Sequence, residues 1–246
     1  MAGRRKDGRG SGRRRLATRV RTARGRKPSS TRWLQRQLND PYVAEAERRG
    51  FRSRAAFKLI ELDDRFHFLK SGARVLDLGA APGGWTQVAT QRIGPKGRIV
   101  AVDLKPMDAV PGATILECDF LDPTATTWIL EALGGKADVV LSDMASPATG
   151  HAPTDHLRIM ALCEAAFDFA EEALAEGGTF LAKVLQGGTE KELLTRLQQR
   201  FRTVRHAKPA ASRPESAETY VIAIGFKGGS SAPHPDVPED REEEPR

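Results

Sequence analysis

Two lysines and two carboxylates, all near the ends of expected helices or strands, are the side chains best suited to proton transfer. They are Lys58, Asp143, Lys183 and Glu218. Lys183 is the least expected, because it lies inside the apolar run 179–184 and a buried ammonium costs desolvation free energy unless it is paired or functional. The alternative is an edge lysine that extends its amine into water, which the central position expected for its strand disfavours. The four residues predict acid–base chemistry.

A glycine-rich turn lies between an apolar strand and a helix-like segment. Residues 75–87 read VLDLGAAPGGWTQ, which is the strand–loop–helix opening of a nucleotide-binding α/β unit. Gly79 and Gly83 let the backbone approach a ligand, because no Cβ blocks it. The spacing differs from G-x-G-x-x-G, and Asp77 precedes the first glycine. A cationic or zwitterionic ligand such as S-adenosylmethionine (SAM) therefore suits the loop, and a tight turn without a ligand is the alternative.

Three aspartates extend this pattern along the expected sheet. Asp77 lies in the first strand, Asp103 ends the second and Asp119 follows the third. Ligands of such sheets bind at the carboxyl ends of the strands. There Asp103 could accept both hydroxyl protons of a ribose, and Asp119 could meet an adenine amino group. For each aspartate alone helix capping is the alternative, and Trp85 is either a wall of the ligand site or a packed core aromatic.

The turn after the fourth strand limits which atom could be methylated. It reads SDMASP over residues 142–147, so it has neither the Asn/Asp-Pro-Pro-Tyr motif of many amine methylases nor a nucleophilic cysteine. A ribose hydroxyl is a weak acid that must lose its proton as it attacks. A lysine serves as the base only if its pKa falls from about 10.4. Burial and Lys58 lower the pKa of Lys183, whereas Asp143 and Glu218 raise it, and no metal is required.

Strands and helices alternate from residue 73 onward, which predicts a doubly wound α/β fold with a mostly parallel, seven-stranded sheet. The last two strands have only a loop between them, so we expect an antiparallel hairpin at one edge. The expected strands are 74–78, 98–102, 114–117, 138–141, 179–184, 203–207 and 219–225. The expected helices are 31–39, 41–49, 53–66, 85–93, 123–133, 154–175 and 190–201, with Asp40 and Ser53 as N-caps.

The net charge of +7 is spread unevenly along the 246 residues. Residues 1–30 contain ten Arg and two Lys against Asp7, a balance of +11, and residues 235–246 balance to −4. We therefore expect a disordered basic tail over 1–30, a folded domain over 31–227 and a disordered acidic, Pro-rich tail over 228–246. The basic tail suits contact with RNA phosphates, and a tail that only improves solubility is the alternative.

A second basic stretch precedes the glycine-rich turn. Residues 31–58 carry seven Arg or Lys against three acids. This excess is either an ordinary solvated helix face or a landing surface for a polyanion beside the ligand site. The two cysteines have no C-x-x-C spacing, and no apolar run approaches the ~18 residues of a membrane span. We expect a cytoplasmic monomer without membrane contact.

Five segments, in order, resemble motifs of the FtsJ/RrmJ (RlmE) family of ribosomal RNA ribose methyltransferases. They are SRAAFK at 53–58, DLGAAPGGW at 77–85, SDMA at 142–145, AKVLQG at 182–187 and RPESAETY at 213–220. The resemblance covers residues 31–227. It implies a Rossmann-like class I SAM-dependent fold and a K-D-K-E tetrad of Lys58, Asp143, Lys183 and Glu218, with Lys183 as the central base.

The resemblance also implies the ligands. The implied SAM contacts are Gly83, Trp85, Asp103, Asp119 and Asp143, with S-adenosylhomocysteine as product. The implied substrate is a uridine 2′-hydroxyl in the A-loop of large-subunit rRNA, on the assembled subunit. Two departures are the added basic tail and the Ala-Ser-Pro of the turn after the fourth strand, where Ala-Pro-Asn is commoner. A tRNA or cap 2′-O-methyltransferase and a non-catalytic RNA-binding assembly factor are the alternatives.

Overall fold

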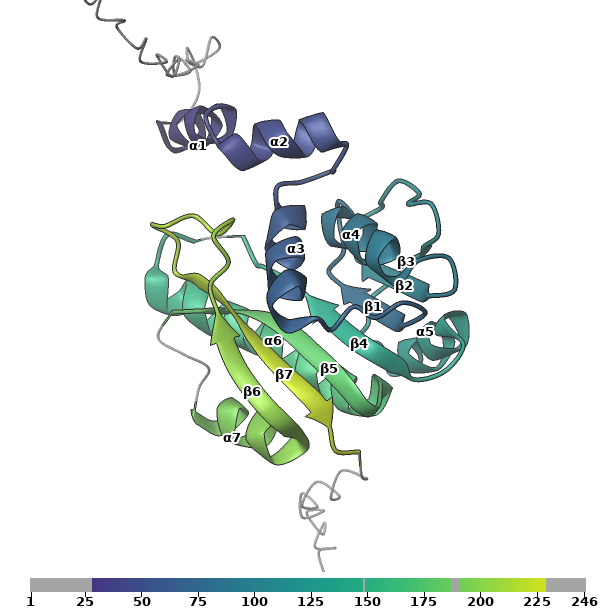
Figure 1. Cartoon of the computed structure of the whole chain (residues 1–246). Coiled ribbons are helices and arrows are strands. Elements are labelled where there is room, and N and C mark those ends of the chain that lie inside the picture. The colour runs from purple at the N-terminus through teal and green to yellow at the C-terminus, as the bar shows by residue number, and fades with distance from the viewer. Residues whose placement is uncertain (1–27, 148, 187–190, 229–246) are drawn as a thin grey trace, which may run out of the picture.

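A seven-stranded sheet with helices on both faces forms the body of the molecule (Figure 1). The computed structural model describes residues 28–147, 149–186 and 191–228. The strands are β1 (Arg74–Leu78), β2 (Arg98–Asp103), β3 (Thr114–Glu117), β4 (Ala137–Ser142), β5 (Leu174–Leu185), β6 (Phe201–Ala207) and β7 (Glu218–Phe226). The helices are α1 (Pro28–Leu38), α2 (Pro41–Arg49), α3 (Ala55–Phe66), α4 (Gly84–Ile93), α5 (Ala125–Leu133), α6 (Ala152–Ala173) and α7 (Lys191–Arg200).

The strand order is β3-β2-β1-β4-β5-β7-β6. The first five strands in this order are parallel, and β7 is antiparallel to both β5 and β6. The central strands are short runs of Val, Leu and Ala buried on both faces, as parallel strands covered by helices must be. This arrangement confirms the expected parallel sheet with an antiparallel hairpin at one edge.

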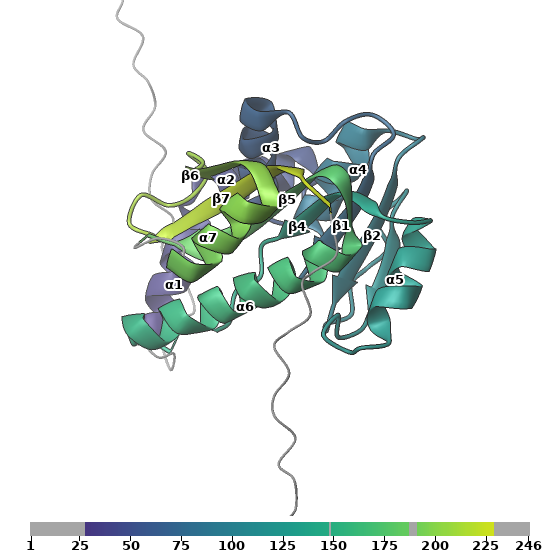
Figure 2. The same ribbon diagram turned by 90° about the horizontal axis from the view of Figure 1, so that it is seen from below.

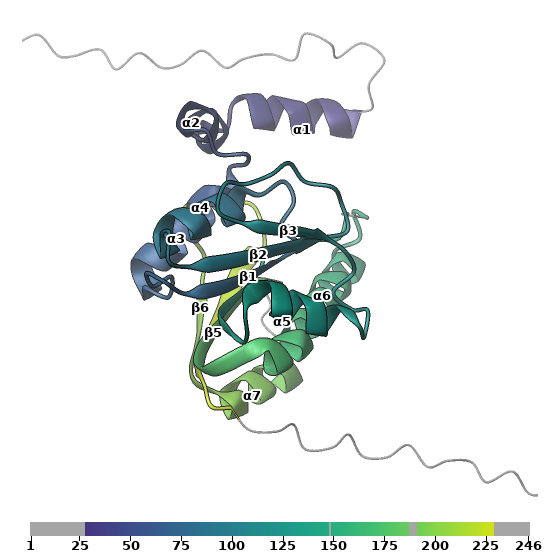
Figure 3. The same cartoon turned by 90° about the vertical axis from the view of Figure 1, so that its right-hand side faces the viewer.

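Two apolar layers separate the sheet from its helices. Helices α3 and α4 cover one face, and α5, α6 and α7 cover the other (Figures 2 and 3). Leu59 of α3 and Val88 of α4 belong to the first layer, whereas Phe167 of α6 and Leu197 of α7 belong to the second. Because helices cover both faces, a ligand is expected at the carboxyl ends of the strands.

The two helices before α3 form an additional layer above it (Figures 1 and 3). The cap expected at the start of α2 is confirmed, because the Asp40 carboxylate accepts a hydrogen bond from the Tyr42 N–H. Gly50, at φ 72°, ends α2 in the left-handed conformation. Ser53 was the wrong cap for the next helix: α3 begins at Ala55, after Arg54, without a side-chain cap.

Several boundaries differ from the expected ones. Helix α1 begins at Pro28, so residues 28–30 belong to a helix and not to the tail expected over 1–30. Helix α6 ends at Ala173, and β5 begins at the next residue, Leu174, earlier than the expected strand. The reason is tertiary: Leu174 pairs with Ala137 of β4, which extends the strand beyond its apolar run.

The expected tails lie largely outside the described residues. Residues 1–27 and 229–246 are not part of the description, so disorder there stays a prediction. Within the described residues, no helix combines the length and apolarity that crossing a membrane requires.

Candidate active site

The glycine-rich turn connects β1 to α4 at the carboxyl edge of the sheet. Gly79 and Gly83 have φ values of 73° and 102°, which L side chains rarely adopt. A Cβ on Gly79 would collide with the Met144 side chain, and one on Gly83 would lie 2.8 Å from an Arg52 guanidinium nitrogen. The turn therefore requires glycine at both positions for conformation and for space.

The two carboxylates expected beside this turn have different surroundings. Asp103 ends β2, and its Oδ2 accepts from the Ala81 N–H at 2.9 Å while its Oδ1 accepts from the Lys105 N–H at 2.9 Å. The structure thus brings Asp103 to the glycine-rich turn. Asp119 is exposed after β3, where it accepts from the Leu121 N–H at 2.9 Å. Asp119 thus stabilises a turn at the same sheet edge.

Asp77 is a buried carboxyl group behind the turn. It is 1% exposed, and its Oδ2 accepts from the Thr86 hydroxyl at 2.6 Å. Burial raises the pKa of Asp77 to about 7; the Thr86 hydrogen bond opposes this shift, and the charges of Asp143 and Asp103 add to it. The side chain therefore ties β1 to α4 and also borders the cavity described next.

A small cavity of about 50 Å³ lies between the glycine-rich turn and the end of β4. Its lining includes the turn, Asp77, Trp85 and Asp143. Trp85 is 3% exposed, donates from its indole N–H to the Ala55 carbonyl at 2.8 Å, and has its ring centroid 5.7 Å from that of Tyr220. Trp85 is thus both a packed aromatic and a wall of the cavity, so the two sequence interpretations are compatible.

The four residues expected to form a tetrad lie together, and one of them, Asp143, also lines this cavity. Lys183 Nζ lies 2.8 Å from Asp143 Oδ1 and 3.5 Å from Glu218 Oε2. Lys58 Nζ lies 2.7 Å from Glu218 Oε1 and 3.8 Å from Asp143 Oδ2. Residues from α3, the end of β4, β5 and the start of β7 thus form one alternating square of cations and anions.

The charges of the square are strongly coupled. Burial lowers the pKa of Lys183, but the charges of Asp143 and Glu218 outweigh burial and raise that pKa above its ordinary value. Burial alone would raise the pKa of Glu218, but the charges of Lys58 and Lys183 lower it to about 2. The balance that the sequence left open therefore favours a protonated Lys183 in this arrangement.

Two further residues touch the tetrad and were not assigned a role from the sequence. The Tyr220 hydroxyl donates to Asp143 Oδ1 at 2.7 Å, and the Ser212 hydroxyl donates to Glu218 Oε1 at 2.8 Å. Burial, then the charge of Asp143, raise the pKa of Tyr220 well above its ordinary value. Tyr220 could have been found from its spacing, since residues two apart on a strand share a face. Ser212 carries no comparable signal, because it lies in a loop.

The basic stretch before the turn is mostly engaged within the protein. The Arg52 guanidinium donates to the carbonyls of Pro82, Asp108 and Ala109. Arg54 pairs with Asp40, and Lys58 belongs to the tetrad. Arg48 pairs with Glu45, and Arg49 stacks on Phe51 and Phe57. The expected landing surface over 32–58 is thus smaller than its formal charge indicates.

Within the described residues, no group of three or more His, Cys, Asp or Glu side chains is placed to hold a metal ion.

Comparisons with known proteins agree on one group of enzymes. The sequence profile described as FtsJ-like methyltransferase matches residues 51–226. A protein of Parvibaculum lavamentivorans named ribosomal RNA large subunit methyltransferase E is 61% identical over 244 residues, covering 94% of this chain and 96% of the relative. A protein of the same name from Paramagnetospirillum magneticum is 63% identical over 224 residues, covering 89% of this chain and 92% of the relative.

A solved structure shows the same fold. The crystal structure of a Plasmodium falciparum protein described as a ribosomal RNA methyltransferase superposes with a TM-score of 0.64 at 33% identity. The match covers 73% of this chain and 100% of that chain.

Proposed function

The chain belongs to the FtsJ-like methyltransferase family, and on that premise we propose that it methylates the 2′-hydroxyl of a uridine in the A-loop of large-subunit rRNA. The family and the named relatives support a SAM-dependent rRNA methyltransferase. The uridine and the A-loop come from the sequence resemblance. We further propose that Lys183 is the general base and that residues 28–228 form one methyltransferase domain that includes α1 and α2.

The observation that supports the proposal is that Asp143 contacts both the cavity at the turn and Lys183. Its side chain borders the cavity at the glycine-rich turn, and its Oδ1 lies 2.8 Å from Lys183 Nζ. A methyl donor held at the turn and a hydroxyl held at Lys183 would therefore be neighbours. In-line transfer of the methyl group from donor to hydroxyl requires that the two groups lie next to each other.

The residues at the turn fit SAM. Gly79 and Gly83 give the turn a conformation that L side chains rarely adopt, Asp103 presents a carboxylate at the end of β2, and Trp85 forms an apolar wall. We propose Asp77, Gly79, Gly83, Trp85, Asp103, Asp119 and Asp143 as the residues that hold it. When bound, SAM supplies an activated methyl group on a positively charged sulfonium.

Lys183 acts on the hydroxyl side of the site. A base must be uncharged before it accepts a proton, whereas Asp143 and Glu218 hold the amine protonated in the described arrangement. The two lysines and two carboxylates have no net charge together. A positively charged ligand beside Lys183 would therefore disfavour the protonated amine and lower the pKa of Lys183. Asp143 and Glu218 then fix the direction of the amine, and Lys58 keeps Glu218 ionised.

We propose that the RNA binds through the basic tail and the exposed part of the segment 32–58, and that the chain acts as a monomer in the cytoplasm. The tail carries +11 within residues 1–30, and polyanion binding scales with the number of cations that neutralise phosphates. On α1 and α2, Arg36, Arg48 and Arg49 are exposed, whereas Arg52, Arg54 and Lys58 are held by protein partners.

The proposal is tested by mapping 2′-O-methylation in rRNA and tRNA from cells that lack the gene. We expect one uridine of the A-loop to lose its mark, and a plasmid copy to restore it while a Lys183→Ala copy does not. Loss of a tRNA mark with unchanged rRNA would refute the substrate. Restoration by the Lys183→Ala copy would refute the base and favour a non-catalytic binding role.

A further inference from the structure

Three consecutive residues of the β6–β7 loop are each held by a different part of the molecule. The first, Ala211, is fully buried and bound through its backbone. Its N–H donates to Glu61 Oε2 at 3.0 Å, and its carbonyl accepts from Arg54 Nη2 at 2.5 Å. Glu61 lies on α3, the helix that carries Lys58, and Arg54 directly precedes that helix, so the loop is attached to α3 and to its N-terminal end.

Ser212 connects the loop to the tetrad. It is 3% exposed, and its hydroxyl donates to Glu218 Oε1 at 2.8 Å. The same oxygen lies 2.7 Å from Lys58 Nζ. The Ser212 hydrogen bond therefore helps to set which way the Glu218 carboxylate faces.

Arg213 connects the loop to α2. Its Nε and Nη2 donate to Asp40 Oδ2 at 3.2 and 3.1 Å. Arg54 Nε lies 3.0 Å from the same oxygen. The other oxygen, Oδ1, accepts from the Tyr42 N–H and so caps α2. One carboxylate with a side chain only 7% exposed thus joins α2, α3 and the loop.

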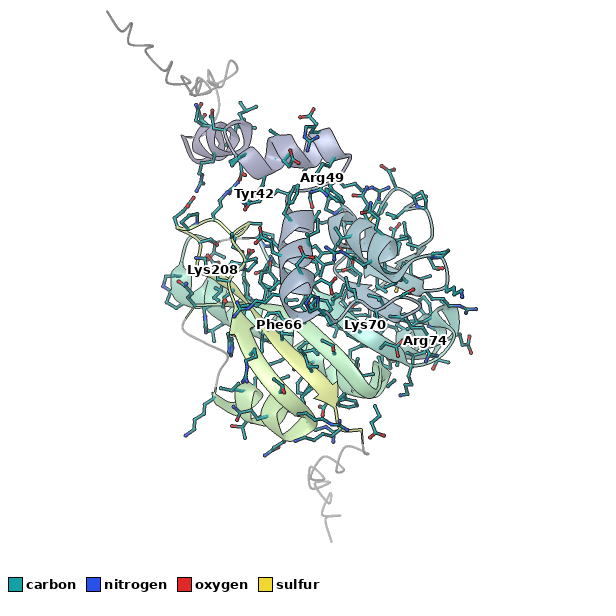
Figure 4. The ribbon with its side chains drawn as sticks, viewed as in Figure 1. Tyr42, Arg49, Phe66, Lys70, Arg74 and Lys208 are labelled. Carbon is teal, nitrogen blue, oxygen red and sulfur yellow. The ribbon has the colours of Figure 1, made fainter. Side chains whose placement is uncertain are left out.

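A second carboxylate closes this arrangement. Glu61 Oε1 accepts from the Tyr42 hydroxyl at 3.3 Å, while its Oε2 holds Ala211. Tyr42 and the loop residue Lys208 lie at the same end of the molecule (Figure 4). Lys208 Nζ donates to the carbonyls of Pro214 and Ser216 across the loop. The loop is therefore fixed on both sides of Ser212.

The buried charges are arranged to fix geometry. Arg54 and Arg213 both contact Asp40, and Glu61 binds the neighbouring Ala211 N–H, so two cations and two anions lie around this loop segment. Partly buried ion pairs add little net stability, because desolvation offsets attraction, but removing one partner leaves an uncompensated charge. Loss of Asp40 would leave two guanidinium groups close together, and the loop segment would move away.

We infer that Asp40 is a positioning residue of the methyl transfer: through Arg54 and Arg213 it holds residues 211–213, so that Ser212 stays hydrogen-bonded to Glu218. The inference rests on the proposed function of the tetrad. It also extends the working site to α2, which precedes the family match at residues 51–226.

The test is Asp40→Asn in the full chain. Asparagine keeps an oxygen for the α2 cap but removes the charge that Arg54 and Arg213 face. We expect kcat to fall roughly ten- to a hundredfold, the scale of a small misplacement at a reacting centre, while the KM for SAM stays within about twofold because the glycine-rich turn is untouched.

A double-mutant cycle separates positioning from general destabilisation. Ser212→Ala should lower kcat to a similar extent, and Asp40→Asn combined with Ser212→Ala should lower it no further, because both changes remove the same support. Additive losses, or an unchanged kcat in Asp40→Asn, would overturn the inference. Should Asp40→Asn not fold, Arg213→Gln replaces it in the same cycle with the same expected outcomes.

Two further variants serve as controls for this experiment. Asp64→Asn removes another carboxylate paired with an arginine, Arg92 at 2.6 Å, on the same helix as Lys58 but at the surface; its kcat should equal that of the parent. Lys183→Ala tests the tetrad itself. Retained turnover in Lys183→Ala would refute the proposed base, whereas an inactive Lys183→Ala with a fully active Asp40→Asn would refute only the positioning role.

Discussion

At the scale of single residues, the protonation of Lys183 decides how the proposed base would work. Its side chain is 8% exposed, and its amine lies between two carboxylates that raise its pKa. A base in this environment acts in the minority, neutral form, so its rate depends on pH far into the alkaline range. In the proposed mechanism the tetrad therefore orients the amine, and deprotonation depends on positive charge that a ligand brings to the neighbouring cavity.

Lys183→Ala removes the proposed base without touching the glycine-rich turn. We expect methyl transfer to fall by about two to four orders of magnitude, the usual contribution of a general base, with SAM affinity within a few fold of the parent. Single-turnover methylation of an rRNA fragment and calorimetric SAM titration measure the two quantities. Strong loss of SAM binding with retained methylation would contradict the base role.

Glu218→Gln tests the electrostatic coupling. Glu218 is ionised at neutral pH, since its pKa is lowered to about 2. Replacing it with a neutral amide removes a negative charge beside Lys183, so the pKa of Lys183 falls. The rising limb of log kcat against pH therefore moves to lower pH, although kcat at its plateau also drops.

The control for this pH profile is Glu215→Gln, which makes the same charge change at an exposed position of the loop that precedes β7. Its limb should coincide with that of the parent enzyme. If the rising part of the pH profile of kcat does not move in Glu218→Gln, Lys183 is not the titrating group.

At the scale of elements, Arg52 links three loops around the cofactor side of the site. Its guanidinium joins the glycine-rich turn at Pro82 to the segment after β2 at Asp108 and Ala109, with distances of 3.2, 2.7 and 2.7 Å. Its backbone N–H donates to the Gln87 side chain at 2.8 Å. The end of β2, where Asp103 lies, is therefore held against the turn by a residue of the connection before α3.

Arg52→Gln should loosen this connection. We expect the Kd for SAM to rise about tenfold, which corresponds to about 1.4 kcal/mol, with kcat at saturating SAM within about twofold, because the tetrad is held by other contacts. Arg65→Gln on α3, which removes an arginine stacked on Phe66, is the matched control and should bind SAM as the parent does. Equal SAM affinity in both variants would exclude the linking role.

At the scale of the whole molecule, charge and chemistry are carried by different parts of the chain. All twelve basic residues of the expected tail precede Pro28, where α1 begins. The described arginines near the site are largely held by protein partners. Under the proposed function, this division would give most of the long-range attraction for RNA to the tail and leave the folded domain to position the nucleotide.

Removal of residues 1–27 leaves α1 complete and tests that division. We expect weaker RNA binding and a flatter dependence of log K on log salt, because fewer counterions are released, while the kcat at saturating RNA stays within about twofold. Filter binding over a salt series measures the slope, and removal of residues 229–246 provides the comparison. An unchanged slope would show that the tail does not contact the RNA.

Local patterns predicted most of the fold. The apolar runs placed all seven strands, and the limits of β1 and β3 agree with the expected 74–78 and 114–117. Errors occurred where distant contacts decide the end of an element. Leu174 joins β5 because it pairs with Ala137, and α3 begins at Ala55 without the Ser53 cap. Neither feature has a signal within its own segment.

The sequence by itself determined the order of strands and helices, the glycine-rich turn and the four residue types of the tetrad, because these depend on local spacing and composition. The tertiary structure decided how the tetrad is paired, which way the pKa of Lys183 moves, that Ser212 and Tyr220 contact the tetrad, and that Asp40 holds Arg213 of the adjoining loop. Hydrogen bonds and burial fix these properties, and both depend on residues that are far apart in the chain.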